Sequence, residues 1–461
     1  MFTEEQKKNH MGKAPVILFV FLLIGFAQSC IEVTNTYNMV APGTWRGMLD
    51  LRDQATLPPH PEHTDPDTKF DFSKTPTGVM PFNFEVDYLN PDSMVIYLIN
   101  GKEKQEISKY KFEHNIKGET GRLTIYFPIY DTRIVADVEA GVMEGYWHVD
   151  YKQNYSIPFK AYLGQQFRFT EIPEPPAADI TGRWAMTFSN DTPDEYPAIG
   201  EFELEGNRLY GNINTETGDY RFAAGEVAGD DIFLSSFNGL QAYLYEGKII
   251  NQDSILGAFY SGNHYRTTWE GIRNPEAKLR SPESLNNATT DQPVAWKART
   301  ITGEKIDFTT APYQDKIKIL EIMGSWCPNC HDEARFLKEW KENNPDFPVE
   351  IVSLSFERYA DSTRSLEVLN EFLKRHAIDW PVVYGGSTQD ARQSEHINFI
   401  DQLKAYPTMV VFDRNNIVRY IHTGFYGPAT TEYEQFKKEF DRRIQNLVQG
   451  ESSTGIMHAM Q

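Results

Sequence analysis

The sequence is poor in cysteine and in positive charge. Only 3 of its 461 residues are cysteines, which excludes a fold braced throughout by disulfides. The formal net charge is −20 at pH 7, which argues against a nucleic-acid partner, because phosphate binding needs clustered Lys and Arg. Hydrophobic residues make up 40% of the chain and aromatic residues 13%, so most of it should fold. The length predicts two or three domains.

The first cysteine, Cys30, ends the segment "APVILFVFLLIGFAQSC". Its apolar run is too short to span a bilayer, which takes roughly 20 residues. Lys13 precedes the run, and the small residues Ala27 and Ser29 close it, which is the layout of a secretory signal. Small residues directly before a cysteine also resemble the lipobox of bacterial lipoproteins, in which the cysteine carries lipid.

This resemblance implies a signal peptide at 1–30 and lipid attachment at Cys30. The expected location is the bacterial cell envelope, facing the periplasm, with the lipid holding the protein to a membrane. An ordinary cleaved signal or a membrane-anchoring helix is the alternative.

The next part of the chain reads as short strands with hardly a helical period. Stretches such as "RLTIYFPI", "EGYWHVDY" and "DIFLSSF" mix aromatic and polar residues between turn residues. The stretch "GTWRGMLDL" around Trp45 is similar to "TGRWAMTFS" around Trp184, and an aromatic hairpin follows each of the two stretches. We predict two related antiparallel β units, sandwiches or small barrels, with a chance match as the alternative. The units are expected at 31–175 and 176–275.

A Pro-, Ser- and Asn-containing linker is expected at 276–290, and the periodicity changes after it. "KIKILEIM" and "VEIVSLSF" are apolar runs typical of buried strands. "CHDEARFLKEWKENN" places apolar residues at helical spacing, and a further helix, two strands and a closing amphipathic helix follow. This alternation predicts an α/β layer structure at 291–450. A flexible tail is expected at 451–461.

The two remaining cysteines lie together in "SWCPNC", as Cys327 and Cys330. A bridge between them would close so small a loop that its effect on stability is minor. Zinc normally takes four ligands, and no second cysteine pair exists here, so we predict neither a metal site nor a cofactor. Redox chemistry is the better explanation for the pair.

Cys327 should lie where a strand gives way to a helix. The unpaired N–H groups and partial positive charge of a helix start stabilise a thiolate, and the pKa of cysteine at such CxxC sites falls from about 8.5 to between roughly 3.5 and 7.5. We therefore expect Cys327 to attack a disulfide and Cys330, one turn into the helix, to resolve the mixed disulfide. Pro328 suits the first helical turn, and Trp326 would flank the thiols with an apolar surface.

With "KIKILEIM" before this motif and "AYPT" far after it, residues 291–447 resemble the thioredoxin fold, and more specifically the TlpA-like thiol-disulfide oxidoreductases. "QPVAWKARTITGEKIDF" is similar to the hairpin that precedes the active strand in that family. The resemblance implies an exported, often membrane-tethered disulfide reductase with a redox disulfide between Cys327 and Cys330. Its partners would be disulfide-bearing client proteins and an upstream thiol donor.

The family resemblance carries over to three more positions. Pro407 falls where the family has a cis-proline facing the cysteines, and the backbone of Tyr406 could pair with a bound substrate strand. Glu321 falls where thioredoxins have a buried acid, which could relay the proton of Cys330. The alternative for Glu321 is a strand residue that faces solvent.

Two residues of the expected helix, Glu333 and His331, are not assigned a definite role from the sequence. Some TlpA-like reductases have a glutamate that adjusts thiol acidity at the position of Glu333, but an ordinary first-turn acid would also fit there. His331 is expected at the surface. In the β-rich region, His60 and His63 near Asp65 and Asp67 could bind a metal, although a solvated Pro-rich loop is the favoured interpretation.

Two other functions compete with the reductase. Peroxiredoxins share the broader fold but place a threonine three residues before the reactive cysteine, where this chain has Gly324. The protein could instead bind a ligand or partner through its β modules and use the thioredoxin-like part as a redox sensor.

Overall fold

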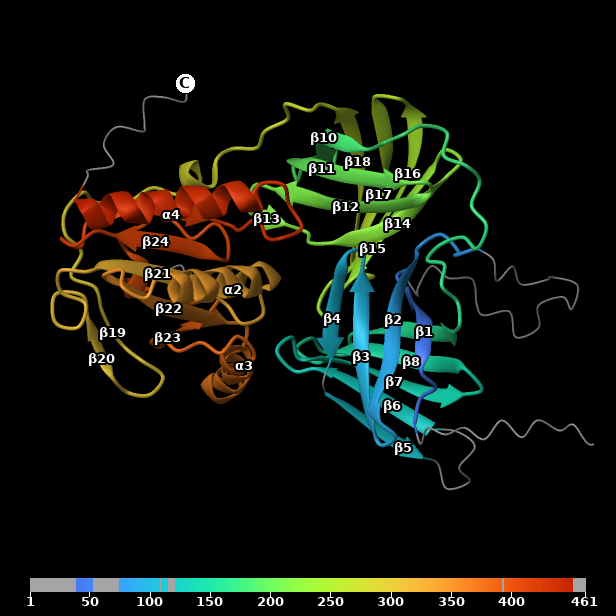
Figure 1. Ribbon diagram of the computed structural model, residues 1–461, viewed down its shortest axis with the longest axis horizontal. Helices are drawn as coiled ribbons and strands as arrows, with labels where there is room; N and C mark the ends of the chain where they lie inside the picture. The colour runs from blue at the N-terminus through green and yellow to red at the C-terminus, as the bar shows by residue number, and fades with distance from the viewer. Residues whose placement is uncertain (1–38, 53–73, 108, 115–120, 392–393, 451–461) are drawn as a thin grey trace, which may run out of the picture.

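Figure 1 shows two β-sheets, coloured blue to green, beside an α/β domain coloured yellow to red. The computed structural model describes residues 39–52, 74–107, 109–114, 121–391 and 394–450. Within those ranges no helix is long and apolar enough to cross a membrane. The predictions that lie outside the described residues concern the signal peptide at 1–30 with Cys30, the loop with His60, His63, Asp65 and Asp67, and the tail at 451–461.

The first sheet has nine antiparallel strands and stays open. Its order is β4-β3-β2-β1-β9-β8-β7-β6-β5, so β4 and β5 form its edges, and we call it the half-barrel. Its concave face buries large apolar side chains, among them Trp45 and Phe82. The strands are β1 Gly43–Asp50, β2 Val79–Asn90, β3 Ser93–Asn100, β4 Glu103–Ile107, β5 Tyr110–His114, β6 Gly121–Phe127, β7 Thr132–Glu139, β8 Val142–Val149 and β9 Ser156–Leu163.

The second sheet closes on itself. Its order is β11-β10-β18-β17-β16-β15-β14-β12-β13, and pairing of β11 with β12 makes eight of these strands a closed barrel, with β13 attached outside. Closure removes the sheet edges, and aromatic side chains such as Trp184 and Phe259 fill the interior. The strands are β10 Gly182–Phe188, β11 Tyr196–Glu205, β12 Arg208–Thr215, β13 Gly218–Asp219, β14 Ala223–Ala228, β15 Asp231–Phe237, β16 Ala242–Asn251, β17 Ser254–Ser261 and β18 Tyr265–Arg273.

The repeated tryptophans occupy matching places in the two sheets. Trp45 on β1 donates a hydrogen bond from its indole to the carbonyl of Ala41 at 3.0 Å, and Trp184 on β10 does the same to Ile180 at 2.9 Å. Each strand pairs with the strand after it and with the last strand of its sheet. The N-terminal region is therefore antiparallel β in two related units, as predicted from the sequence.

A buried arginine joins the half-barrel to the barrel. Arg168, in the segment between β9 and β10, donates to the hydroxyl of Ser235 on β15 at 2.8 Å and to the carbonyl of Ile99 on β3 at 3.1 Å. Burial lowers the pKa of Arg168 to about 9. The rings of Phe82 and Phe237 meet beside it, with centroids 4.5 Å apart, so the two sheets share one core.

The expected linker is docked on the α/β domain. It contains the short 3-10 helix η1 (Pro282–Ser284), and Leu285 and Asn286 after it are buried. The amide of Asn286 donates to Asp401 at 2.9 Å. The polar side chains of this linker therefore form specific hydrogen bonds with the α/β domain.

The α/β domain is built on a five-stranded sheet of order β23-β22-β21-β24-β25. Strands β21, β22 and β23 are parallel, and β24 and β25 run antiparallel to their neighbours. Because side chains alternate along β21, Leu320 and Ile322 pack on one face while Ile317 and Ile319 pack on the other. The elements are hairpin β19 Lys297–Arg299 and β20 Lys305–Asp307, β21 Ile317–Met323, α2 Pro328–Asn343, β22 Val349–Glu357, α3 Ser362–Arg375, β23 Val382–Ser387, η3 Glu395–Ile397, β24 Thr408–Phe412, β25 Val418–Thr423 and α4 Tyr433–Gln449.

Replacing Arg168 with lysine tests the junction of the two sheets. Arg168→Lys keeps the positive charge but cannot span the same acceptors, so buried carbonyl and hydroxyl groups lose partners. We expect a loss of about 2–4 kcal/mol in the free energy of unfolding of the β-rich region, measured by urea titration. Arg122→Lys, which alters an exposed pair with Asp137, is the control and should leave the titration unchanged. Equal stability of the two variants would contradict this role for Arg168.

Candidate active site

Cys327 caps the start of helix α2. Strand β21 ends at Met323, and Cys327 has extended backbone angles (φ −92°, ψ 117°) directly before the first helical residue, Pro328. Its sulfur accepts a hydrogen bond from the backbone N–H of Cys330 at 3.3 Å. The reactive position predicted from the sequence therefore lies at the positive end of the helix, where the N–H of Cys330 points at the sulfur.

The two cysteines have different surroundings. Both are free thiols, and Cys327 is 5% exposed while Cys330 is fully buried. The thiol of Cys327 also lies 3.3 Å from the carbonyl oxygen of Tyr406. Burial, together with the neighbouring Cys327 sulfur, raises the pKa of Cys330 well above its ordinary value. The inner thiol therefore holds its proton more firmly than a free cysteine does.

The expected supporting residues gather around Cys327. The peptide bond between Tyr406 and Pro407 is cis, as the resemblance implies. The rings of Tyr406 and Trp326 meet edge to face at 5.2 Å, and the Trp326 indole donates to the carbonyl of Phe356 at 3.0 Å. Segments from 326, 356 and 406 thus form one wall around the sulfur.

Two glutamates lie buried beneath the site. Glu321 on β21 is fully buried and accepts a hydrogen bond from the hydroxyl of Ser353, while its other oxygen has no partner among the described residues. Burial raises the pKa of Glu321 to about 7. Glu333 on α2 is also fully buried, and neither of its oxygens has a hydrogen-bond partner within the described ranges. Burial raises its pKa well above the ordinary value, and the nearby charge of Glu321 adds to the effect.

This geometry decides between the alternatives left open by the sequence. Glu321 does not face solvent, and Glu333 is not an ordinary first-turn acid. Both carboxyl groups are buried, and they repel each other when both are charged, which disfavours simultaneous ionisation of the pair.

The expectation that His331 lies at the surface is wrong. Its side chain is buried, with Nδ1 2.6 Å from Nε2 of His376 and Nε2 3.0 Å from the carbonyl oxygen of Ser325. The rings of Phe372 on α3 and Tyr130 from the half-barrel pack against it. Burial lowers the pKa of His331 far below its ordinary value, so the ring is neutral and its hydrogen bonds hold the chain before Cys327.

Two further residues support the site and were not singled out from the sequence. Glu357, at the end of β22, accepts hydrogen bonds from the backbone and hydroxyl of Ser325 at 3.0 and 2.7 Å. The guanidinium of Arg358 lies over the ring of Trp326 at 4.7 Å and over that of Tyr151, from the half-barrel, at 4.4 Å. Adjacent parallel strands end at the same sheet edge, so the residues at the end of β22 could have been expected beside those at the end of β21. This pattern could have predicted that Glu357 and Arg358 lie near the site.

The position before the motif has no room for a larger side chain. A Cβ atom on Gly324 would lie 2.3 Å from the indole nitrogen of Trp326 and 2.8 Å from the carbonyl oxygen of Phe356. The threonine that peroxiredoxins place here would therefore collide with the wall of the site. Among the residues that the structure describes, no group of three or more His, Cys, Asp or Glu side chains is placed to hold a metal ion.

Residues 288–435 match the family model described as Redoxin. The C-terminal region is thus a redoxin domain with a thioredoxin-like fold, which confirms that part of the fold prediction. Sporulation thiol-disulfide oxidoreductase A of Bacillus subtilis (strain 168) is 26% identical over 91 residues. That alignment covers 20% of this chain and 52% of the relative, so it spans about half of the relative's length.

Solved structures give matches of the same kind. A thioredoxin family thiol:disulfide interchange protein from Chlorobium tepidum is 19% identical, with 35% of this chain and 99% of that chain covered and a TM-score of 0.27. StoA from Bacillus subtilis is 22% identical, with 32% and 98% covered and a TM-score of 0.24. A DsbF homologue from Corynebacterium diphtheriae is 20% identical, with 37% and 97% covered and a TM-score of 0.26.

Burial of Glu321 predicts a specific dependence of stability on pH. Its pKa is about 7 in the folded protein against an ordinary value of 4.5, so between these values the folded state binds more protons and stability falls as pH rises. Glu321→Gln removes this loss. We expect the unfolding free energy of the variant, relative to the wild type, to rise by about 3 kcal/mol between about pH 4 and pH 8 in urea titrations.

The matched control for this titration is Glu342→Gln on the exposed side of α2. Its stability curve should run parallel to that of the wild type across the same pH range. A parallel curve for Glu321→Gln as well would show that this carboxyl titrates normally in the folded protein.

Proposed function

We propose that this protein is a thiol-disulfide oxidoreductase that works as a disulfide reductase, with Cys327 attacking and Cys330 resolving. The observation that carries the proposal is the asymmetry of the pair. The sulfur of Cys327 accepts an N–H at a helix start, whereas the thiol of Cys330 is fully buried with a raised pKa. We therefore assign the attacking role to Cys327 and the resolving role to Cys330.

The proposed reaction moves two electrons from the cysteine pair to a client. The Cys327 thiolate attacks a client disulfide, its S–S bond breaks, and the first client sulfur leaves and takes up a proton. Cys330 then loses its proton and attacks the Cys327 sulfur, which forms the Cys327–Cys330 disulfide and releases the second client thiol. An upstream thiol donor reduces this disulfide for the next cycle.

The buried glutamates support the second step. Cys330 must lose a proton inside the protein, where water cannot take it, so an internal base is needed. Glu321, with a pKa of about 7, can accept a proton at neutral pH and release it afterwards. Glu333 shares the compartment, and its charge interacts with both Glu321 and Cys327.

The wall around Cys327 is the proposed docking surface for the client. The backbone of Tyr406, before the cis-proline Pro407, would pair with a client strand, and Trp326 would contact it through its ring. Pro328 occupies the first helical position, where its missing N–H leaves no helical hydrogen bond unmade.

The proposed location is the bacterial cell envelope, facing the periplasm, with a lipid anchor on Cys30. This rests on the apolar segment and small residues before Cys30 in the sequence. In such a location the partners would be disulfide-bearing proteins of the same compartment and a thiol donor.

Substitution of each cysteine tests the assigned roles. We expect Cys327→Ala to lower the rate of insulin-disulfide reduction, followed with dithiothreitol as electron donor, by at least about 100-fold, because no attacking sulfur remains. Cys330→Ala should instead accumulate mixed disulfides with clients, visible as slower bands on non-reducing gels that disappear on reduction.

Cys30→Ala is the control for the third thiol and should reduce insulin like the wild type. Activity that persists in both Cys327→Ala and Cys330→Ala, or adducts that form in Cys327→Ala, would refute the proposed mechanism.

A further inference from the structure

The sulfur that must attack is covered. Cys327 is only 5% exposed, and the apolar cluster to which it belongs includes residues of both β-sheets. Thiol–disulfide exchange requires the attacking sulfur to reach one sulfur of the client disulfide, so its rate depends on access. The access of a client disulfide to this sulfur therefore depends on the residues that cover it.

The barrel contacts the CPNC motif through the hairpin of β12 and β13. Gly218, in β13, has φ +135°, and a Cβ atom there would lie 2.1 Å from the side-chain nitrogen of Asn329. The same atom would lie 3.2 Å from the carbonyl oxygen of Phe425, close to the cis-proline loop. Glycine at 218 therefore lets the barrel backbone approach Asn329, one of the two residues between the cysteines, closely.

Arg221, just after this hairpin, ties three parts of the molecule together. It is 9% exposed, and its guanidinium donates to Asp332 on α2 and to the carbonyl oxygen of Pro328 at 3.3 Å. It also pairs with Glu103 of the half-barrel at 2.6 Å. Arg221 has φ 63°, a conformation uncommon for residues other than glycine, and the buried contacts hold it there.

The half-barrel completes the enclosure with two aromatic side chains. Tyr130 packs on His331, with ring centroids 5.3 Å apart. Tyr151 lies on the Arg358 guanidinium, which also contacts the ring of Trp326 in the wall around Cys327. Both sheets thus contact residues next to the reactive sulfur.

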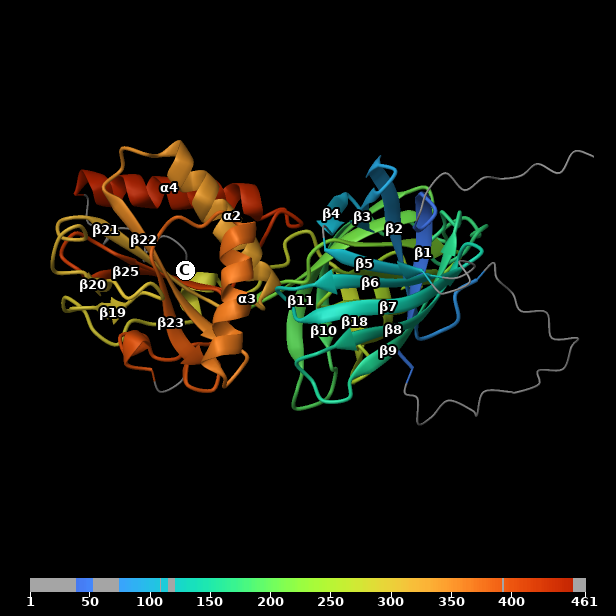
Figure 2. The ribbon, with the colours of Figure 1, turned by 90° about the horizontal axis from the view of Figure 1, so that it is seen from below.

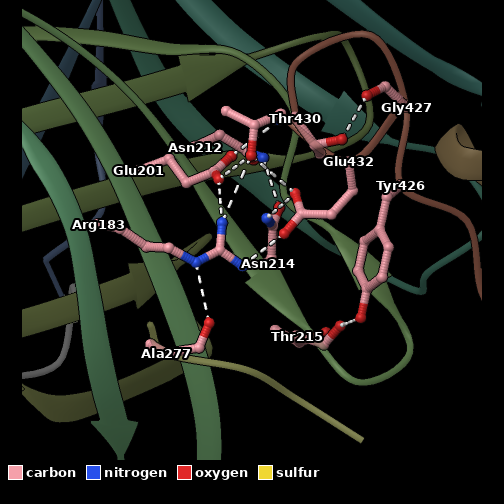
Figure 3. A network of polar contacts seen from close by, with 11 residues as sticks. Arg183, Glu201, Asn212, Asn214, Thr215, Ala277, Tyr426, Gly427, Thr430 and Glu432 are labelled. Atoms are coloured by element: carbon pink, nitrogen blue, oxygen red, sulfur yellow. Dashed lines mark hydrogen bonds and ion pairs between the residues drawn. The ribbon is translucent and has the colours of Figure 1, made fainter. Parts of the chain in front are cut away.

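A second contact of the barrel lies farther along the interface and is also polar. Figure 3 shows Arg183 of β10 between Glu201 and Glu432, with its Nε donating to the carbonyl of Ala277 at 3.0 Å. The hydroxyl of Tyr426 donates to the carbonyl of Thr215 at 2.9 Å. Ion pairs and hydrogen bonds of this kind are typical of interfaces between domains of one chain, which are more polar than those of permanent complexes.

We propose that the β-rich region is a cover that closes over Cys327, and that Arg221 holds it closed. Exchange with a protein client would then occur only after the cover separates from α2. This inference rests on the proposed function for its biological meaning. Without Arg221, Asp332 on α2 would lie near Glu103 and the buried Asp219 of the cover with no shared cation, and only the open form moves Asp332 away from the other two acids. The closed form would therefore lose stability relative to the open one.

The test measures the access of reagents to Cys327 in the full, reduced chain. Alkylation rates are compared for N-ethylmaleimide and a polyethylene-glycol maleimide, and the signal that remains in Cys327→Ala is subtracted to remove other thiols. We expect the wild type to react slowly with the bulky reagent, and Arg221→Ala to react at least about tenfold faster, which corresponds to a shift of about 1.4 kcal/mol in the closing equilibrium.

Further variants distinguish opening of the cover from unfolding of the protein. Arg221→Lys should restore slow alkylation at least in part, because it supplies a cation to the same acids. Arg122→Ala, at an exposed pair on the half-barrel, should behave like the wild type. Melting temperatures close to that of the wild type confirm folding, and should Arg221→Ala fail to fold, Tyr151→Ala, which frees one side of Arg358, replaces it with the same expected direction.

Access and activity give independent answers. Equal rates of the two reagents in the wild type, or unchanged access in the folded Arg221→Ala and Tyr151→Ala variants, would overturn the inference. Faster alkylation of these variants, with no insulin reduction in any form of the chain, would sustain the cover and refute the oxidoreductase.

Discussion

The site depends on one hydrogen bond at the start of helix α2, from the backbone of Cys330 to the sulfur of Cys327. It fixes the outer sulfur against the helix terminus, where the peptide dipoles favour negative charge. The neighbouring contacts keep that arrangement in place. Glu357 holds Ser325 before the motif, and the carbonyl of Tyr406 meets the sulfur from the cis-proline loop. The inner thiol is fully buried, so the two sulfurs lie in different environments.

Much of the fold follows from local patterns. The run "KIKILEIM" is a central strand because both of its faces are covered, and a glutamate inside such a run has little chance of reaching water, as Glu321 shows. The matching tryptophans, Trp45 and Trp184, marked the two β units because each occupies the same place in its sheet. The sequence left open whether the units were sandwiches or barrels, since closure depends on pairing of β11 with β12, which is a property of the whole sheet.

The parts that could not be predicted arise from contacts between distant segments. His331 reads as a polar residue early in a helix, and only Tyr130 and Phe372, from two other elements, make its environment apolar. Glu333 is buried for a similar reason, since no helical period distinguishes a covered acid from an exposed one. Arg221 lies in a stretch of the barrel that carries no motif, so its pairing with Asp332 was invisible before the domains were assembled.

The arginine between the two sheets has a mechanical consequence. Because Arg168 is bonded to both β15 and β3, the half-barrel and the barrel would move as one lever in the opening proposed above. The chain that joins this lever to the redoxin domain is anchored on both sides: Arg280 pairs with Glu216 of the barrel, and Glu283 with Arg443 of α4. In that opening the short stretch between Arg280 and Glu283 would be the pivot, and a small rotation there would displace the far ends of both sheets by a larger distance.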